Sequence, residues 1–317
     1  MKNANKVPTI SVIIPTRNRW ASLKRLLQSI CLSVNVDLKN DVEVIIVDDA
    51  STAKPPHSIF NFCNMFYRFL IIRNERCLGA SASRNRGLVA SKGKYLLFVD
   101  DDAVLSPNFI STLMKLLNEN NNIGMAGGII KYLKKPMKAQ YIAWRVNLTP
   151  LAFLHGNITY ESAKSIEGLE LLDADYIPTA FLVKREIVMK IGGFDEKIPL
   201  YYDDSDFGYR IKKLGFKIVI DPSISVYHDT GDTIFSNPRK IYMCIRNSSI
   251  FMVKHSNIHR LSISLGACIL SIRYFFQILK QSPMTDFFTL VRSCLYITRG
   301  LIEAAFLSIV IKRNDHR

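Results

Sequence analysis

Apolar segments of strand length alternate with amphipathic helical segments along the N-terminal part of the chain, and this alternation constrains the fold most. The apolar runs are residues 9–14, 42–47, 69–72 and 95–99. Such runs are typical of strands buried on both faces of a parallel sheet. Between the first two runs, leucines recur at the spacing of one helical face. The alternation predicts an α/β fold with a mostly parallel, Rossmann-like sheet and helices on both faces.

The sequence after residue 105 continues this pattern with one interruption. Ser106 and Pro107 predict the N-cap and first position of a helix that ends near Asn120. Residues 131–173 show no strong periodicity, which indicates a variable insertion or a lid. Regular structure is expected again as strands at residues 179–184 and 218–220 and as helices at residues 185–191 and 203–214.

Three carboxylates, Asp100, Asp101 and Asp102, close the apolar run at residues 95–99. Carboxylates this close raise one another's pKa unless a cation binds nearby. Hard carboxylate oxygens suit Mg²⁺ or Mn²⁺, ions that also bridge phosphate oxygens. The triplet therefore indicates a divalent metal site, and its alternative is a solvated turn before the next helix.

Two further polar turns follow predicted strands. The turn from Pro15 to Asn18 follows the first strand, and Asp48 and Asp49 follow the second. Because ligands of open α/β sheets bind beyond the carboxyl ends of the strands, we expect these turns and the acidic triplet to line one crevice. Asp48 or Asp49 can accept hydrogen bonds from a base or ribose. Taken alone, however, this pair is more typical of an Asx turn.

The predicted helix that begins at Asp203 carries the most informative acidic segment. Asp206 and Arg210 are spaced to pair on one helical face, which leaves Asp203 and Asp204 at the positive N-terminal end. The spacing favours Asp203 as an N-cap and Asp204 as a candidate general base. His228 lies in a loop rich in small polar residues and is the histidine best placed for a functional role.

The charge balance narrows the partners. Forty-two Lys and Arg against 27 Asp and Glu give a net charge of +15, which favours anionic partners such as nucleotide phosphates or an acidic membrane. The basic residues are dispersed without a nucleic-acid-binding motif, so no nucleic acid partner is expected. The first turn lacks glycine, which argues against a dehydrogenase or a nucleotidyltransferase. Arg84 and Arg86 supply positive charge suited to a diphosphate.

Residues 257–317 differ in composition from the rest of the chain. Two apolar stretches, Leu261–Leu279 and Phe287–Ile311, are interrupted by charges, which predicts amphipathic helices rather than membrane spans. From Lys254 to Arg317, nine Lys and Arg stand against three Asp and Glu. The stretch therefore suits peripheral contact with anionic lipid and equally suits a helical cap on the catalytic domain. The polar N-terminus and scattered cysteines lead us to expect a cytoplasmic protein, peripheral on the inner face of the membrane if the helices bind lipid.

The order of these motifs resembles family 2 glycosyltransferases, in particular the bacterial polysaccharide and rhamnosyltransferase-like group. The resemblance covers roughly residues 7–232 and includes the donor-side and acceptor-side motifs of the family. The motifs are Ser11–Asn18, Val47–Ser51, Gly79 with Ala82–Gly87, Phe98–Asp102, Gly192–Glu196, and Asp203–Asp206 with Arg210.

The resemblance implies a GT-A catalytic domain over residues 1–256, with a donor half at about 7–130 and an acceptor half at about 131–256, followed by the helical region at 257–317. It implies an inverting, metal-dependent hexosyltransferase that uses a UDP- or dTDP-linked donor and a glycan or lipid-linked acceptor of a surface polysaccharide.

The resemblance also assigns roles to the matching residues. Asp102, Asp100 and His228 would hold Mn²⁺ or Mg²⁺ on the donor diphosphate. Asp204 would be the base. Because Asp203 stands where the family usually has Glu, the resemblance allows either Asp203 or Asp204 to be the base. The nucleotide-sugar-binding residues implied are Pro15, Thr16, Arg17, Asp48, Asp49, Arg84, Asp100 and Asp101. The alternative function is a non-catalytic nucleotide-sugar-binding or scaffold protein that keeps the same fold.

Overall fold

The computed structural model describes residues 7–148, 158–161, 170–229 and 238–257, and short runs between residues 265 and 306. The chain forms two compact units. The first comprises Met1–Arg145, Tyr160–Pro199 and Asp203–Thr230, and the second comprises Val146–Thr159, Leu200–Tyr202 and Gly231–Arg317. The expected division into residues 1–256 and 257–317 stays a prediction.

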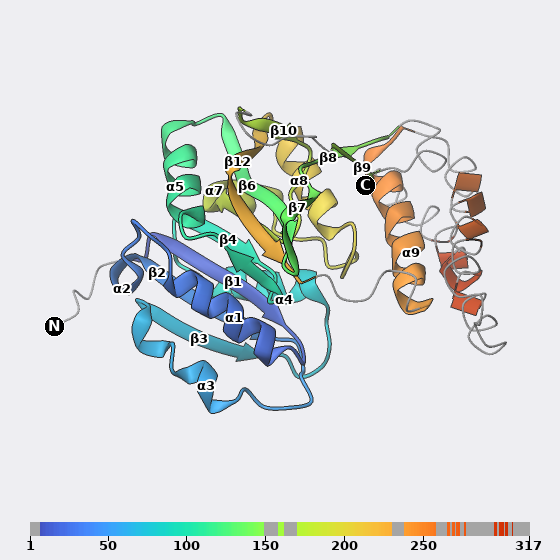
Figure 1. Ribbon diagram of the computed structural model, residues 1–317. Helices are drawn as coiled ribbons and strands as arrows, with labels where there is room; N and C mark the ends of the chain where they lie inside the picture. The colour runs from blue at the N-terminus through green and yellow to red at the C-terminus, as the bar shows by residue number, and fades with distance from the viewer. Residues whose placement is uncertain are drawn as a thin grey trace. The chain divides into compact units, whose positions relative to one another are not determined.

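One large sheet organises the first unit (Figure 1), in the order β10-β12-β6-β11-β4-β1-β2-β3, with β5 paired to β12 and β7 paired to β6. A separate pair joins β8 (Ala143–Val146) and β9 (Ile158–Glu161). The strands of the large sheet are β1 (Ile10–Thr16), β2 (Val42–Asp48), β3 (Arg68–Arg73), β4 (Tyr95–Val99), β5 (Ala103–Leu105), β6 (Ile123–Tyr132), β7 (Lys135–Tyr141), β10 (Leu172–Ala174), β11 (Ala180–Lys184) and β12 (Lys217–His228).

The sheet is mixed rather than mostly parallel. β3, β2, β1 and β4 run parallel to one another, as predicted for the donor half. Beyond them, β11 pairs antiparallel with both β4 and β6, while β12 runs parallel to β6. A further antiparallel pair forms after β6, because β7 returns directly along β6 as a hairpin instead of crossing over through a helix.

Helices cover both faces of the sheet, as predicted. Residues on β1 alternate between the two faces: Val12 packs in the cluster that includes the apolar faces of α1 and α5, whereas Ile13 packs with residues of α7 and α8. The helices are α1 (Trp20–Cys31), α2 (Leu38–Asp41), α3 (His57–Phe60), a 3₁₀ turn (Cys63–Met65), α4 (Ala80–Ala90), α5 (Phe109–Glu119), α7 (Arg185–Ile191), α8 (Asp203–Lys213) and α9 (Pro238–His255).

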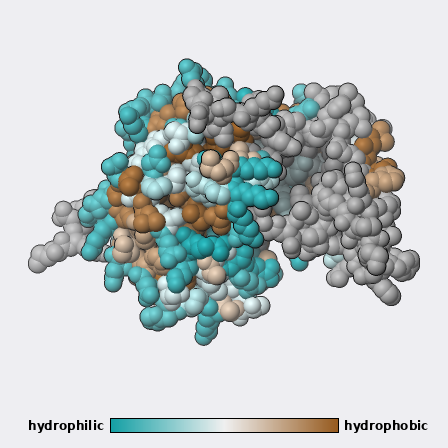
Figure 2. All heavy atoms as spheres, in the orientation of Figure 1, coloured by the Kyte–Doolittle hydropathy of each residue, from teal (hydrophilic) through white to brown (hydrophobic). Residues whose placement is uncertain are grey.

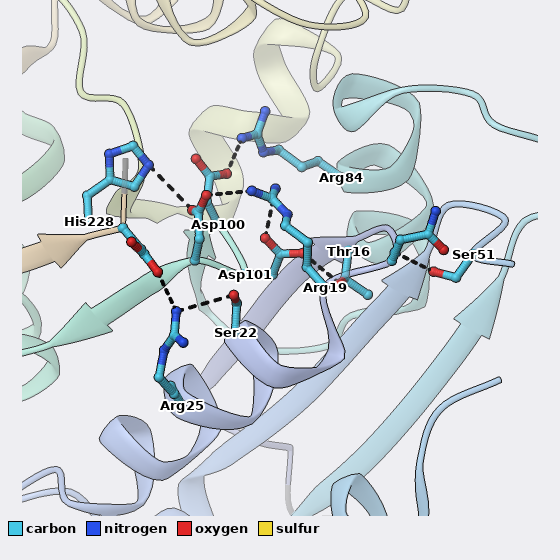
Figure 3. Close-up of polar contacts among 12 residues, drawn as sticks. Thr16, Arg19, Ser22, Arg25, Ser51, Arg84, Asp100, Asp101 and His228 are labelled. Carbon is cyan, nitrogen blue, oxygen red and sulfur yellow. Dashed lines mark hydrogen bonds and ion pairs between the residues drawn. The ribbon is translucent and has the colours of Figure 1, made fainter. Parts of the chain in front are cut away.

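Helix α4 approaches β1 closely because Gly87 lacks a side chain. A Cβ atom at this position would lie 2.4 Å from Cγ2 of Ile13. This close approach brings Arg84, three residues earlier on the same helix, to the carboxyl edge of the sheet (Figure 3).

Helix α5 starts later than the sequence predicts. It begins at Phe109, with Asn108 in the N-cap position. Ser106 instead pairs with Ser225 of β12: its amide donates to the Ser225 carbonyl at 3.0 Å, and its Oγ accepts from the Ser225 amide at 3.1 Å. The prediction of Ser106 as N-cap was wrong because this tertiary contact takes up the side chain.

The second unit contains α9 and helical positions between residues 265 and 306. Tyr242 and Arg246 of α9 both bond Glu303, with the Arg246 contact at 3.1 Å. Arg299 reaches the same carboxylate at 3.0 Å. Within the described part of the chain, no helix combines the length and apolarity needed to span a bilayer.

Candidate active site

The sheet brings the predicted polar turns to one edge. Thr16 at the end of β1 is in register with Asp48 at the end of β2, and the Asp49 amide donates to the Thr16 carbonyl at 2.8 Å. β4 lies parallel to β1 on its other side, so the acidic triplet leaves the sheet at the same edge. Figure 3 shows Arg19, Arg84 and His228 pointing toward the carboxylates there. The three predicted turns therefore meet, as the sequence indicates.

Asp101 lies between the first turn and the end of β4, and it is fully buried. Thr16 Oγ1 donates to its Oδ2 at 2.6 Å, and Arg19 Nη2 lies 2.8 Å from its Oδ1. Burial raises the pKa of Asp101 to about 7, and the Arg19 charge and the Thr16 hydrogen bond oppose that rise. These contacts give Asp101 a positioning role, since it fixes the β1 turn against the end of β4.

Asp102 meets His228 because of strand register. β5 begins directly after the acidic triplet and pairs antiparallel with β12, which sets His228 opposite Ala103. His228 Nε2 lies 3.4 Å from Asp102 Oδ1, while Arg19 Nη1 lies 2.5 Å from Oδ2. Burial alone would raise the pKa of Asp102, but His228 and Arg19 hold it below its ordinary value. The pKa of His228 is raised because Asp102 outweighs the effect of burial.

Arg84 joins the donor-side and acceptor-side carboxylates. Its side chain is 5% exposed, and its Nη2 lies 2.7 Å from Asp100 Oδ1. Its Nη1 lies 2.5 Å from Asp203 Oδ2 and 3.6 Å from Asp204 Oδ1. Burial would lower the pKa of Arg84, but the three carboxylates raise it, so this guanidinium stays charged. One buried cation therefore connects the end of β4 with the first turn of α8.

The two carboxylates of α8 differ in how they are engaged. Asp203 accepts the short Arg84 bond, whereas Asp204 Oδ1 is buried and accepts no hydrogen bond from the described residues. Burial, together with the charges of Asp203 and Asp100, raises the pKa of Asp204 well above its ordinary value, against the effect of Arg84. Burial also raises the pKa of Asp203. An underused carboxylate with a raised pKa is suited to accept a proton.

Asp48 and Asp49 are occupied by the protein itself. Asp48 accepts from the Ser51 amide at 2.9 Å and pairs with Arg73 at 2.7 Å. Asp49 accepts from the Leu78 amide at 2.7 Å, the Gly79 amide at 2.9 Å, and two side chains. Although burial would raise its pKa, these hydrogen bonds hold the pKa of Asp49 below its ordinary value. Both residues fix the local turns, as their alternative interpretation predicts.

The remaining predicted residues lie at the edge of the site. Pro15 is half-buried within β1 and faces Val47 of β2. Arg17 is exposed, and its Nη1 lies 3.1 Å from the Cys77 thiol. Cys77 in turn donates to Asp49 at 3.2 Å. Arg17 is therefore positioned beside the turn that Asp49 holds.

Sequence reasoning missed Arg19, Gln140 and Asn85. Arg19 pairs with two members of the acidic triplet. Gln140 Oε1 lies 3.3 Å from His228 Nδ1. Asn85 bonds the backbone of Phe194 in both directions, at 2.9 and 2.8 Å. A basic residue at the end of the first polar turn was a usable signal for Arg19, whereas only tertiary structure reveals the other two contacts.

The residues of the predicted metal site can hold a divalent cation only if phosphate oxygens of a bound nucleotide and water molecules supply the other ligands. Among the described residues, no cluster of three or more His, Cys, Asp or Glu side chains is arranged to hold a metal ion. Asp100 is committed to Arg84, which leaves Asp102 and His228. Mg²⁺ in nucleotide sites needs one or two carboxylates and takes its other ligands from phosphates and water. Asp102 Oδ1, which is buried and receives no well-aligned hydrogen bond from the described residues, is a suitable ligand atom.

The sequence matches known glycosyltransferases. The model of Glycosyl transferase family 2 matches residues 11–192. An uncharacterized glycosyltransferase of Haemophilus influenzae is 28% identical over 229 residues, 69% of this chain and 64% of that protein. A GalNAc(5)-diNAcBac-PP-undecaprenol beta-1,3-glucosyltransferase of Campylobacter jejuni is 34% identical over 114 residues, 36% of each chain. The chain thus spans less than two thirds of the length of either relative.

Solved structures share the fold. S. aureus TarS 1-349 in complex with UDP-GlcNAc has a TM-score of 0.57 and 17% identity, covering 94% of this chain and 81% of that chain. GalNAc-T7 with UDP, GalNAc and Mn²⁺ has a TM-score of 0.58 and 15% identity, covering 88% of this chain and 57% of that chain. With the family match, these likenesses confirm the predicted GT-A fold. The rhamnosyltransferase-like subgroup stays a prediction.

Proposed function

The chain belongs to glycosyl transferase family 2, and from this membership we propose that it transfers a sugar from a nucleotide diphosphate donor to an acceptor hydroxyl, with inversion at the anomeric carbon. The observation that carries the proposal is the contact of Arg84 with Asp100 on one side and with Asp203 and Asp204 on the other. This contact couples the carboxylates beside the donor to the candidate base.

The donor in this proposal is a UDP- or dTDP-linked hexose. The TarS structure is in complex with UDP-GlcNAc and the GalNAc-T7 structure holds UDP, which supports a uridine nucleotide. Exposed Arg17 and half-exposed Arg19 border the carboxyl edge of β1 and supply cations for a diphosphate. Arg19 is already held by Asp101 and Asp102, so it is oriented before the donor arrives.

Asp102 and His228 would hold Mn²⁺ or Mg²⁺, and Asp100 would act through Arg84. GalNAc-T7 is seen with Mn²⁺, which supports the choice of ion. A bound divalent cation would neutralise charge on the departing diphosphate. His228 is held for this role by Gln140 at its Nδ1, which leaves Nε2 facing Asp102.

Asp204 is the proposed base, with Asp203 as its positioning neighbour. Asp204 would take the proton of the acceptor hydroxyl while that oxygen forms its bond to the anomeric carbon. The bond from the anomeric carbon to the donor diphosphate breaks on the opposite face, so the configuration inverts. Asp203 is bonded by Arg84, whereas Asp204 keeps a buried oxygen without a hydrogen bond from the described residues. This difference favours Asp204 for the proton transfer.

The proposed acceptor is a glycan or lipid-linked glycan of a surface polysaccharide, with the protein peripheral on the cytoplasmic face of the membrane. The name of the Campylobacter relative specifies an undecaprenol-linked acceptor, which supports a lipid-linked substrate. Two sets of exposed apolar side chains between residues 265 and 306 share the same helical spacing. Figure 2 shows a few hydrophobic side chains exposed where Figure 1 draws these helical positions in red. These residues are Leu265, Ile272 and Phe276, and Leu295, Ile302 and Phe306.

The proposal is tested with purified protein, Mn²⁺ and a panel of sugar nucleotides, by measuring released nucleoside diphosphate. We expect metal-dependent turnover, and we expect Asp102→Asn and Asp204→Asn each to lower kcat by at least about 100-fold. Asp173→Asn, at an exposed position on β10, is the matched control. Full activity in excess chelator would remove the metal from the mechanism.

The alternative is a non-catalytic nucleotide-sugar-binding protein. It predicts that donor binding, measured by calorimetry, persists while no acceptor or donor condition gives turnover. Binding without turnover across the whole donor and acceptor panel would favour this alternative over the enzyme.

A further inference from the structure

The hairpin formed by β6 and β7 carries a concentration of positive charge that the proposed chemistry does not use. Lys131, Lys134, Lys135 and Lys138 lie in or beside its turn. No acidic residue occurs between Glu119 and Glu161. None of the four lysines forms an ion pair with another described residue. The hairpin is therefore a basic projection of the first unit.

An apolar side chain stands in the middle of these charges. Met137 is 96% exposed, the largest exposure among the described large hydrophobic residues. Lys134, Lys135, Pro136 and Lys138 around it are also exposed. Lysine and proline alone are explained by protection of an open sheet edge against pairing with other strands. A fully exposed methionine adds nothing to such protection.

The hairpin is attached directly to the candidate site. The Leu133 amide donates to the His228 carbonyl at 3.0 Å. Gln140 on β7 contacts the His228 ring, with 3.3 Å between Oε1 and Nδ1. A surface that binds the hairpin is consequently held beside the proposed metal and donor site.

We propose that this hairpin docks on an anionic lipid bilayer, with Met137 entering the boundary between headgroups and acyl chains. The flanking lysines then contact lipid phosphates, and their long stems allow the ammonium groups to stay in the headgroup layer. A soluble polyanion matches the lysines but leaves Met137 in water, so the apolar tip favours the bilayer. The inference deepens the proposed function, because it brings a lipid-linked acceptor toward the site.

The test measures binding of the full chain to vesicles of equimolar phosphatidylglycerol and phosphatidylcholine, with pure phosphatidylcholine vesicles alongside. We expect the triple variant Lys134→Gln, Lys135→Gln, Lys138→Gln to lower the partition coefficient on the anionic vesicles about 100-fold at low salt. The matched control replaces three exposed lysines elsewhere, Lys39→Gln, Lys115→Gln and Lys190→Gln. This control has the same net charge, and we expect it to bind within about threefold of the parent.

A fluorescence readout reports on the tip itself. Met137→Trp is expected to show a blue-shifted emission on anionic vesicles and no shift on pure phosphatidylcholine. Met189→Trp, at another exposed methionine on α7, is expected to show no shift on either. An unshifted Met137→Trp spectrum on anionic vesicles overturns the proposal, and so does unchanged vesicle binding by the hairpin triple variant.

Two further outcomes distinguish bilayer docking from polyanion binding and from the proposed catalytic function. If soluble polyphosphate binds the hairpin and the tip tryptophan never shifts, the hairpin is a polyanion site and the bilayer proposal is wrong. Metal-dependent donor hydrolysis in solution tests the proposed function alone, and we expect the hairpin variants to retain it. Absence of that hydrolysis in the parent protein would overturn the proposed function. Hairpin-dependent vesicle binding would still support bilayer docking.

Discussion

Arg84 determines which carboxylates of the site are held by ion pairs and which one stays able to accept a proton. Three carboxylates surround this buried guanidinium, yet it bonds only Asp100 and Asp203 closely and lies 3.6 Å from Asp204. A planar fork of donors can hold two carboxylates in fixed directions, which a lysine ammonium cannot do. The third carboxylate, Asp204, feels the charge of Arg84 but accepts no hydrogen bond at Oδ1 from the described residues, so this oxygen can accept a proton.

The pH dependence of kcat/KM distinguishes Asp203 from Asp204 as the base. A base acts when deprotonated, so activity falls as the pH drops through its pKa; because burial raises the pKa of Asp204, the acid limb is expected well above about pH 4. Asp203→Asn removes a negative neighbour of Asp204 and should move that limb to lower pH. Loss of all activity in Asp203→Asn, with activity retained in Asp204→Asn, would reverse the assignment.

At the scale of single residues, the sequence predicted which acidic side chains meet but not which groups form hydrogen bonds and ion pairs with them. Asp102 was predictable because it follows the apolar strand β4. His228 was predictable from the small polar residues around it, although the structure places it at the end of β12 rather than in a loop. The saturation of Asp49 by two backbone amides was not, because those donors come from the loop before α4. Arg19 was missed because its partners lie more than 80 positions away in the sequence.

At the scale of elements, strands and helices with a clear local pattern were predicted, and those formed by tertiary contacts were not. β4 and α7 have the predicted bounds, since apolar runs and turn residues define them locally. β6 contains Gly124, Gly127 and Gly128, which weaken a strand pattern, yet it lies inside the sheet. A Cβ at Gly128 would lie 2.7 Å from the Ile224 carbonyl oxygen, so close packing against β12 requires glycine at this position.

Helices α4 and α8 together hold the loop that follows α7. Asn85 bonds the Phe194 backbone through both the nitrogen and the oxygen of its side-chain amide, and Arg210 Nη1 donates to the carbonyls of Ile191 and Gly193 at 2.7 and 2.8 Å. The Arg84 guanidinium lies 5.1 Å above the Phe194 ring. The loop is thereby fixed under the side chain that organises the carboxylates.

Asn85→Ala is expected to loosen this loop and to act on kcat more than on donor KM. Two part-buried backbone groups lose their partners, which should cost about 1–3 kcal/mol in the free energy of urea unfolding. Asn61→Ala, at an exposed position after α3, should leave both quantities unchanged. A kcat of Asn85→Ala equal to that of the parent would show that the loop does not position Arg84.

At the scale of the whole molecule, the site depends on residues from opposite ends of the first unit. Thr16 bonds Asp101, and Asp102 contacts His228, so the first and last strands of the unit both reach the acidic triplet. The mixed sheet makes this possible, because the end of β12, which runs parallel to β6, also pairs antiparallel with β5, the strand directly after the triplet. Local patterns predict the strands, whereas this pairing follows from tertiary packing that no single segment encodes.

The net charge of +15 would act on the proposed anionic donor as a long-range field, separate from the contacts of the site. The KM for a nucleotide diphosphate sugar should therefore rise about three- to tenfold between roughly 20 mM and 300 mM salt. The inhibition constant of uridine, which carries no charge, should change little over the same range. The triple variant Lys39→Gln, Lys115→Gln, Lys190→Gln lowers the field without touching the site, so its KM should depend less steeply on salt. Equal salt dependence for uridine and the charged donor would show that the field plays no part in capture.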